Sequence, residues 1–375
     1  MLSVTCDGPS CNFSMMHALN LKIEPPNMKC WFPHPADASV RVNVILDACH
    51  MLKLMRNCLA SYGVLKDDNS DKINWNYIEQ LHKLQEREGL RLGNKLKSTH
   101  IMWQKQKMKV NLAAQTLSAS VADAIEFCNV HRKLFQFSGS EATVHFLRFI
   151  DRLFDVLNSR NPVAKGYKAS MKPSNECVWR PFLEEAKQYL LKLTDDKGLP
   201  MYTTKRRTAF VGLLCTTDFI VAVYNDLVAA ANAPLKYLLT YKVSQDHLEL
   251  FFGAVRASCG SNNNPTVRQF VAAYKWLLMR HNVQGGLGNC SVQDGTSLLS
   301  VTADSIGVSD AQQDTLGLSV ARMYDLQSRP PVSTDHDYAD VPNTAMLSQY
   351  KKAIITYMAG YVVKMVKRKI SCNDC

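Results

Sequence analysis

Hydrophobic and polar positions divide the first part of the chain into strand-like runs and amphipathic helices. Residues 40–46 alternate at first and then become fully apolar, which predicts a strand that enters a buried sheet and stops at Asp47. From about Cys49 the apolar side chains recur at helical spacing. Two more helices are predicted, over residues 76–91 and 113–128.

The middle of the chain is predicted to be nearly all-helical. Residues 143–160 carry one apolar stripe, while Asp151, Asp155 and Asn158 share another face of the same helix. The remaining predicted helices cover residues 181–193, 207–231, 244–258 and 265–280. Residues 283–343 are rich in Ser, Thr, Asp, Gly and Gln, which is typical of a linker or a disordered segment.

Composition narrows the class of protein. The 375 residues are 46% hydrophobic and 21% charged, which excludes a wholly disordered chain and leaves room for about two domains. Lys and Arg total 44 against 33 Asp and Glu, a formal net charge of +11. This surplus favours a polyanionic partner, because phosphate contacts release counterions. A merely basic soluble protein explains the charge equally well.

Cysteine usage and hydropathy indicate the compartment. The twelve cysteines have no regular spacing, and the first residues lack a charged segment followed by an apolar one. We therefore expect reduced thiols in the cytosol or nucleus. The most apolar stretch, residues 209–231, is interrupted by Asp218, Asn225 and Asp226, so a buried helix is expected there and no membrane partner.

A basic stretch lies between two of the predicted helices. Residues 91–109 contain no acidic residue and place Trp103 among several cations, which suits a nucleic-acid backbone. The candidate DNA contacts are Lys95, Lys97, Lys105, Lys107 and Lys109. A solvated face with a core tryptophan remains an equal alternative.

Asp47 is the first candidate for chemistry. A carboxylate at the carboxyl end of a buried strand lies where open α/β sheets bind ligands. His50, Lys53 and Arg56 follow on the next helical turns, and the two cations could reach a phosphate. The alternative is a structural role, in which Asp47 caps the helix that starts near Cys49.

Glu249 is the second candidate. It lies at the border of the apolar face of the helix predicted over residues 244–258. Two carboxylates of this kind fit a site for paired Mg²⁺ ions, which prefer oxygen ligands and need few protein carboxylates. Asp246 and Glu249 also match the spacing of a capping box, a purely structural alternative.

Four stretches of the chain resemble the P element-type DNA transposases, whose relatives carry an amino-terminal THAP zinc finger. They are residues 44–57, 104–124, 244–252 and 357–363. The resemblance implies an α/β plus α fold, a ribonuclease H-like catalytic core interrupted by an all-helical insertion that binds guanine nucleotide. It divides the chain into a first core part at 1–128, the insertion at 129–240, returning core helices at 241–282, a linker at 283–343 and a basic carboxy-terminal helix at 344–375.

The same resemblance assigns roles to single residues. Asp47 corresponds to the second acid of a catalytic triad and Glu249 to the third, and both would bind Mg²⁺ or Mn²⁺. Asp246, Asp155 and Asn158 correspond to contacts of the guanine nucleotide, GTP. The implied function is cut-and-paste transposition: cleavage and joining of DNA at transposon ends and target, in the nucleus, by a homo-oligomer.

The chain also departs from the family pattern. The first acid is expected on a strand well before Asp47, and Asp7 with Gly8 resembles a dipeptide that leads into the first core helix, so Asp7 is not expected to be that acid. The zinc finger is missing, and Cys372 and Cys375 form at most half of a zinc site. We therefore expect little or no cleavage by this chain alone. Three interpretations stay open: a truncated gene model of a transposase, a domesticated, non-catalytic protein that binds DNA or a partner, and a pseudogene product.

Overall fold

The computed structural model describes residues 3–260, 262–280 and 356. Its contacts divide the chain into two units. The first comprises residues 1–274 and 283–296, and the second comprises residues 275–282 and 297–375. All sites considered below lie in the first unit.

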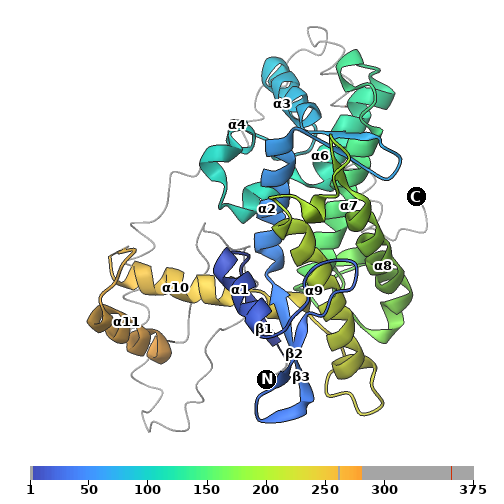
Figure 1. The fold of residues 1–375 in the computed structure, drawn as a ribbon. Helices are drawn as coiled ribbons and strands as arrows, with labels where there is room; N and C mark the ends of the chain where they lie inside the picture. Colours follow the sequence, from blue (N-terminus) through green and yellow to red (C-terminus); the bar gives the residue numbers. More distant parts are fainter. Residues whose placement is uncertain (1–2, 261, 281–355, 357–375) are drawn as a thin grey trace, which may run out of the picture. The chain divides into compact units, whose positions relative to one another are not determined.

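A three-stranded sheet forms one end of this unit. Its strands are β1 (Ser3–Cys6), β2 (Trp31–His34) and β3 (Asp37–Leu46), in the order β1-β3-β2. β1 runs parallel to β3, with Cys6 opposite Leu46, and β2 runs antiparallel to it. Helix α1 (Ser10–Ala18) follows β1. The apolar end of β3 is buried, which confirms the strand predicted there, and β1 and β3 end at the same edge of the sheet (Figure 1).

Two long helices pack at the centre of this unit. α2 (Ala48–Tyr62) follows β3 directly, and α9 (Thr208–Tyr224) packs against both α2 and β3. α9 is apolar on nearly all sides, as a fully buried helix requires. With its continuation to Ala229 it is long and apolar enough to cross a membrane, but 67% of that segment is buried inside the protein. This is the core helix expected from the sequence.

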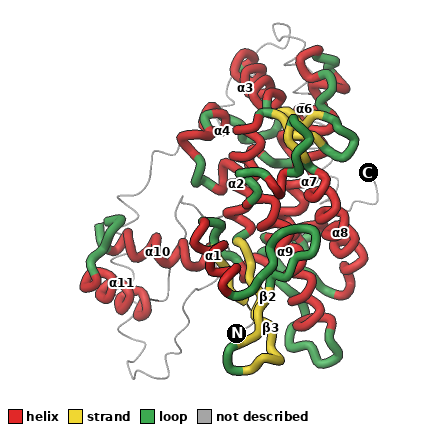
Figure 2. The backbone as a smooth tube through the Cα atoms, in the orientation of Figure 1, coloured by secondary structure: helices red, strands yellow, loops and turns green. Residues whose placement is uncertain are grey.

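Helices dominate the part of the chain between α2 and α9, as Figure 2 shows. In chain order they are α3 (Asn76–Glu88), α4 (Ser98–Ile101), α5 (Val110–Thr116), α6 (Ala119–Glu126), α7 (Glu141–Leu157) and α8 (Glu176–Lys192). A small antiparallel sheet lies beside them, with β4 (Val64–Lys66) between β5 (Lys72–Asn74) and β6 (Thr194–Asp195). After α9 the chain forms α10 (Asp246–Ser258) and α11 (Val267–Arg280).

The structure corrects two predicted helices. The helix expected over residues 113–128 is interrupted at Leu117, because Ser118 adopts an extended conformation and caps α6 through Val121 N–H. The helix expected from Pro181 begins five residues earlier, at Glu176, and contains Pro181 in its interior. The predicted linker (283–343), the carboxy-terminal helix (344–375) and the half zinc site lie outside the described residues, apart from the single residue Thr356.

Candidate active site

Asp47 is buried between the end of β3 and the start of α10. Its side chain is 5% exposed and accepts two backbone hydrogen bonds, from His50 N–H at 2.8 Å and from Gln245 N–H at 3.1 Å. The first bond confirms that Asp47 caps α2. Burial raises the pKa of Asp47 to about 6, although the two backbone donors oppose this shift. The carboxylate is therefore ionised at neutral pH and holds two elements together.

Asp7 lies at the same edge of the sheet as Asp47. Each acid immediately follows a strand, and the two strands are parallel neighbours. The Asp7 side chain is 43% exposed, and one of its oxygens lies 3.6 Å from His50 Nδ1. Burial lowers the pKa of His50. The edge therefore carries one buried and one accessible carboxylate.

The two cations of α2 that could reach a phosphate, Lys53 and Arg56, are both buried, and the phosphate contact stays a prediction. The Arg56 guanidinium donates to Asn57 Oδ1 at 2.8 Å and to the carbonyl of Gln106 at 2.9 Å, so it ties α2 to the segment before α5. Burial lowers its pKa to about 10, which leaves it charged at neutral pH.

Glu249 projects from the first turn of α10 and is exposed. The capping box considered for Asp246 and Glu249 is not formed, because Gln245 occupies the N-cap position and no side chain caps the helix. The start of α10 is held at the sheet edge by Gln245 N–H on Asp47 and by a 2.8 Å bond from Thr5 Oγ1 to the Val243 carbonyl. Glu249 lies one turn beyond Gln245, bonded to it through the helix backbone.

Among the described residues, no three His, Cys, Asp or Glu side chains are already gathered closely enough to enclose a metal ion. The arrangement is an open edge with two neighbouring carboxylates, and a third on the helix docked against it. This suits Mg²⁺ better than Zn²⁺, because Mg²⁺ retains several waters and uses one or two protein carboxylates.

A second cluster joins the carboxyl end of α7 to α10. Arg160 contacts the carboxylate of Asp246, which is 5% exposed, and lies 3.3 Å from Asn158 Oδ1. The guanidinium also lies 5.5 Å from the ring centroid of Tyr241. The structure therefore brings together two of the three residues expected to contact a nucleotide, with a cation between them.

Asp155, the third of these residues, lies one turn before Asn158 and pairs with Lys168 at 3.7 Å. Burial raises the pKa of Asp155 to about 6, and the positive charge of Lys168 opposes the shift. Burial also raises the pKa of Asp151, one turn earlier on α7. A partly buried acid with a perturbed pKa is typical of a binding site.

The basic stretch presents its cations to solvent. The five lysines predicted to contact DNA are all exposed: Lys95, Lys97, Lys105, Lys107 and Lys109. Trp103 is 7% exposed, so it is a core residue and is not interleaved with the cations, although Lys107 Nζ lies 5.8 Å from its ring. The segment is a solvated face with a core tryptophan, and DNA contact by its five exposed lysines stays a prediction.

Sequence reasoning missed two residues of these clusters, Arg160 and Lys168, and it considered Asp7 but set it aside as the first acid. Asp7 had a signal, since it also follows a short β-branched run, Val4 and Thr5, but the strand is too short to stand out. Arg160 and Lys168 had none. Arg160 meets Asp246 from 86 positions away, and that proximity arises only from the tertiary fold.

Comparison with known proteins adds family information to this geometry. A family model described as a TNP-like, GTP-binding insertion domain matches residues 49–170. A second, described as a TNP-like, RNase H C-terminal domain, matches residues 241–275. The residues matched by the two family models differ from the domain bounds expected from the sequence, which place the insertion at 129–240. The division of the chain into domains at those expected bounds stays a prediction.

Two curated proteins and one solved structure are similar to this chain. The human protein named DNA transposase THAP9 is 31% identical over 383 aligned positions, which cover 100% of this chain and 41% of the human protein. The Transposable element P transposase of Drosophila melanogaster is 26% identical over 244 positions, covering 64% of this chain and 31% of that protein. The chain thus spans less than half the length of either relative.

The structural similarity concerns the fold. The Drosophila P element transposase strand transfer complex contains a chain that matches with a TM-score of 0.63 and 24% identity. The match covers 74% of this chain and 60% of the other. It supports a mixed helical and sheet architecture shared by the two proteins.

Proposed function

The chain belongs to the P element-type DNA transposase family, and from this premise we propose that it forms part of a metal-dependent DNA cleavage and strand-transfer centre. The observation that carries the proposal is the hydrogen bond between Gln245 and Asp47. This bond docks the helix that bears Glu249 against the strand edge that bears Asp7 and Asp47.

The carboxylates fit a divalent ion by their chemistry. A carboxylate has about four lone-pair sites, so the two backbone bonds of Asp47 leave capacity for a metal ion. Asp7 is accessible, and Glu249 is exposed on the docked helix. We propose that Asp47 and Glu249 bind Mg²⁺ or Mn²⁺, and we add Asp7 as a third carboxylate at the same edge.

The bound ion would activate the attacking water or hydroxyl and stabilise the leaving oxygen. The residues of the chain would supply the geometry. Asp47 fixes the start of α10 and thereby the position of Glu249. The exposed lysines at 95, 97, 105, 107 and 109 would hold the DNA backbone, with affinity that falls as salt rises.

We further propose that Asp155, Asn158 and Asp246 contact a guanine nucleotide. The support is the gathering of Asn158 and Asp246 around Arg160, the partly buried Asp155 one helical turn before Asn158, and the family model of a GTP-binding insertion domain over residues 49–170. A nucleotide that hydrogen-bonds to Asn158 and Asp246 would have to share or displace Arg160. Action on transposon ends and chromosomal target would place the protein in the nucleus, where we propose that it acts as a homo-oligomer.

Mn²⁺ binding measured by isothermal titration calorimetry tests the centre without requiring DNA. We expect Asp7→Asn and Glu249→Gln each to weaken binding at least tenfold, while Glu184→Gln, an exposed acid on α8, leaves it unchanged. Nicking of supercoiled plasmid with Mn²⁺ is the second readout. Nicking by Glu249→Gln at the wild-type rate would remove Glu249 from the centre.

A non-catalytic DNA-binding protein on the same scaffold is the second candidate function. The observation that favours it is the structural role of Asp47, which caps α2 and is almost inaccessible. This alternative predicts no Mn²⁺ binding at the sheet edge, together with salt-sensitive DNA binding that persists in Glu249→Gln. The calorimetric measurement of Mn²⁺ binding therefore separates the two functions, and DNA binding by Glu249→Gln is the additional readout.

A further inference from the structure

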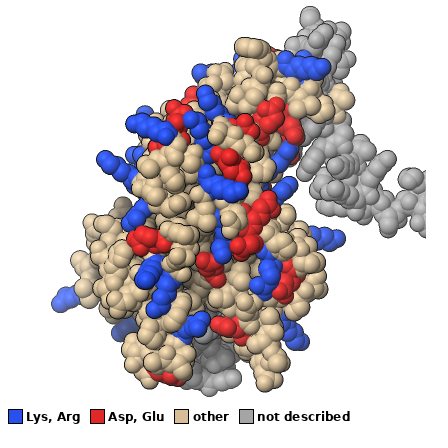
Figure 3. All heavy atoms as spheres, turned by 45° about the vertical axis from the view of Figure 1, so that its right-hand side comes forward, with Lys and Arg blue, Asp and Glu red and all other residues tan. Residues whose placement is uncertain are grey.

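An acidic groove is lined by none of the residues of the two clusters described above. Two adjacent hollows, of about 300 and 430 Å³, lie along α7 and α8 and share Glu141, His145 and Glu185 in their walls. Figure 3 shows several Asp and Glu side chains on the face that includes α8, although the whole chain carries a net charge of +11. We call these two hollows together the acidic groove.

The groove holds more negative charge than its own cations neutralise. Arg148 is engaged by Asp123 and Glu126, and Lys192 pairs with Asp68 at 3.1 Å. Four carboxylates of the groove have no ion-pair partner within 4.0 Å among the described residues: Asp67, Asp71, Glu141 and Glu185. Of the arginines and lysines that line the groove, only Arg152 has no ion-pair partner among the described residues. Its guanidinium lies 5.7 Å from the ring centroid of Tyr167.

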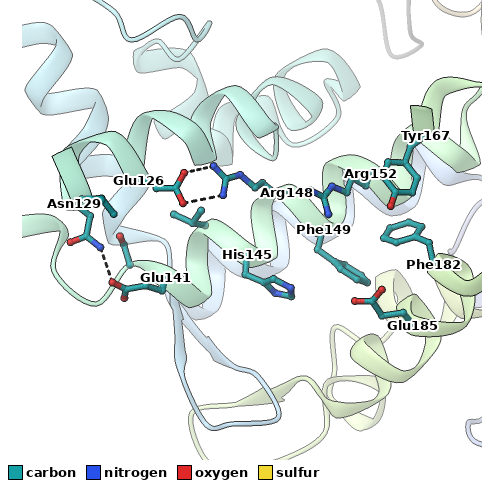
Figure 4. Close-up of a pocket in the computed structure, with 13 residues that line it drawn as sticks. Glu126, Asn129, Glu141, His145, Arg148, Phe149, Arg152, Tyr167, Phe182 and Glu185 are labelled. Atoms are coloured by element: carbon teal, nitrogen blue, oxygen red, sulfur yellow. Dashed lines mark hydrogen bonds and ion pairs between the residues drawn. The ribbon is translucent and has the colours of Figure 1, made fainter. Parts of the chain in front are cut away.

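Aromatic rings form one wall of the groove. Phe149 lies 5.4 Å from Phe182 between ring centroids, and Phe182 lies 4.7 Å from Tyr167. Figure 4 shows His145, Phe149 and Glu185 directed toward the same space. Ring faces beside carboxylates favour a cation, because the π face attracts positive charge.

A buried hydroxyl in the same wall is left without a partner. Ser140 is fully buried and occupies the N-cap position of α7, where a serine usually accepts a backbone N–H. Its side chain caps nothing, and Oγ has no hydrogen-bond partner although it lines the first hollow. Tyr189, in the second hollow, likewise has a buried hydroxyl without a partner. Both hydroxyls can accept a hydrogen bond from a ligand.

We propose that the acidic groove binds an arginine-rich segment of another protein. Its polar groups are mainly acceptors, and a guanidinium offers five donors and no acceptor. Its carboxylates repel phosphate, so neither DNA nor a nucleotide suits it. The two adjacent hollows would take side chains of one extended polypeptide, with a guanidinium beside Glu185, whose carboxylate lines both hollows.

Fluorescence anisotropy with a labelled ten-residue peptide of alternating Arg and Gly tests this proposal. The protein is basic, so long-range electrostatics oppose binding and any affinity reports the local site. The double variant Glu141→Gln/Glu185→Gln is expected to weaken binding at least tenfold. The matched control is Glu184→Gln, which removes an exposed acid from the same helix beside Lys187 and is expected to change affinity less than twofold.

Each outcome decides the proposal. Equal affinity of the wild type and the double variant would overturn it, as would an equal loss in Glu184→Gln, since the peptide would then sense only surface charge. A Lys–Gly peptide is expected to bind several-fold more weakly, because an ammonium cannot make the planar contacts of a guanidinium. Spermidine and unlabelled Arg–Gly peptide can each be added as a competitor of the labelled peptide. If spermidine displaces the labelled peptide at the lower concentration, the groove is a site for small organic cations and the proposal is overturned. Self-association abolished by the double variant would assign it to a second copy of this chain.

Discussion

The backbone N–H of Gln245 donates a 3.1 Å hydrogen bond to the carboxylate of Asp47, across 198 positions of sequence. The same carboxylate accepts His50 N–H, so one acid fixes the starts of both α2 and α10. Asp47, which we propose as a metal ligand, thus also has a structural role, because its carboxylate holds the starts of two helices. The two roles are compatible, but they make different predictions for substitutions.

Replacing Asp47 by alanine should destabilise the protein. Loss of the cap and of the bond from Gln245 is expected to lower the free energy of unfolding by about 2 kcal/mol. Asp47→Asn, which keeps an acceptor oxygen, should cost less. Urea denaturation measures both, with the exposed Asp226→Ala as the control. An equal free energy of unfolding for Asp47→Ala and the wild type would show that the two hydrogen bonds of Asp47 do not stabilise the fold.

Arg160 should be coupled to Asp246. Arg160→Met leaves a nearly inaccessible carboxylate without this cation, which should cost about 3 kcal/mol. In a double-mutant cycle, adding Asp246→Asn should recover much of that loss, because the buried charge is then removed. Strictly additive effects of the two substitutions would mean that the pair contributes nothing to folding.

Asp155 should make the free energy of unfolding depend on pH, and the direction of its raised pKa gives the sign of that dependence. Its pKa is raised to about 6 in the folded protein, against 3.8 as the ordinary value. The stability linked to this group is fully present below its unfolded pKa and is lost as pH rises through about 6. Asp155→Asn should therefore raise the free energy of unfolding at pH 8 by about 1 kcal/mol, less than the full shift implies because the side chain is 22% exposed.

Thermal unfolding at pH 4 and pH 8 checks this prediction. The advantage of Asp155→Asn over the wild type should appear at pH 8 and vanish at pH 4, while Asp226→Asn shows no pH-dependent difference. An advantage of equal size at both pH values would exclude the titration of Asp155 as its cause.

Two glycine-to-alanine substitutions should have opposite effects. At Gly212, in α9, an added Cβ would lie 2.8 Å from Cγ of Met51 and 3.2 Å from Cβ of Leu46, so Gly212→Ala should cost about 2 kcal/mol through overpacking. At Gly253, in α10, the Cβ meets nothing within 4 Å. Gly253→Ala should stabilise the helix by about 0.5 kcal/mol. Chemical denaturation of the two variants beside the wild type measures the contrast.

The spacing of apolar residues along the chain predicted the helices whose burial imposes that spacing. The stripe on α7 and the apolar surface of α9 were evident in the sequence, because burial imposes helical spacing on side chains. The break at Leu117 was not, because neither Gly nor Pro marks it, and the local signal is only Ser118, a residue type that favours helix caps. Pro181 gave a false start for α8, since a proline is tolerated inside that helix.

The sites divide in the same way. The positions of Asp47 at the end of a strand and of Glu249 on a helix border were evident in the sequence. Their assignment as metal ligands rests also on the family resemblance and stays a prediction. Asp7 required knowledge that β1 pairs with β3, and pairing between short strands is decided by tertiary contacts. The acidic groove could not be predicted either, because its walls come from the β4–β5 turn, α6, α7 and α8, segments that only the folded chain brings together.

α10 carries Asp246 and Glu249 within a single turn. Asp246 contacts Arg160, in the cluster that we propose to contact guanine nucleotide, and Glu249 belongs to the proposed metal edge. A ligand that moves one end of this turn necessarily shifts the other, and equilibrium linkage then works in both directions. If guanine nucleotide changes the affinity for Mn²⁺ by some factor, Mn²⁺ must change the affinity for guanine nucleotide by the same factor.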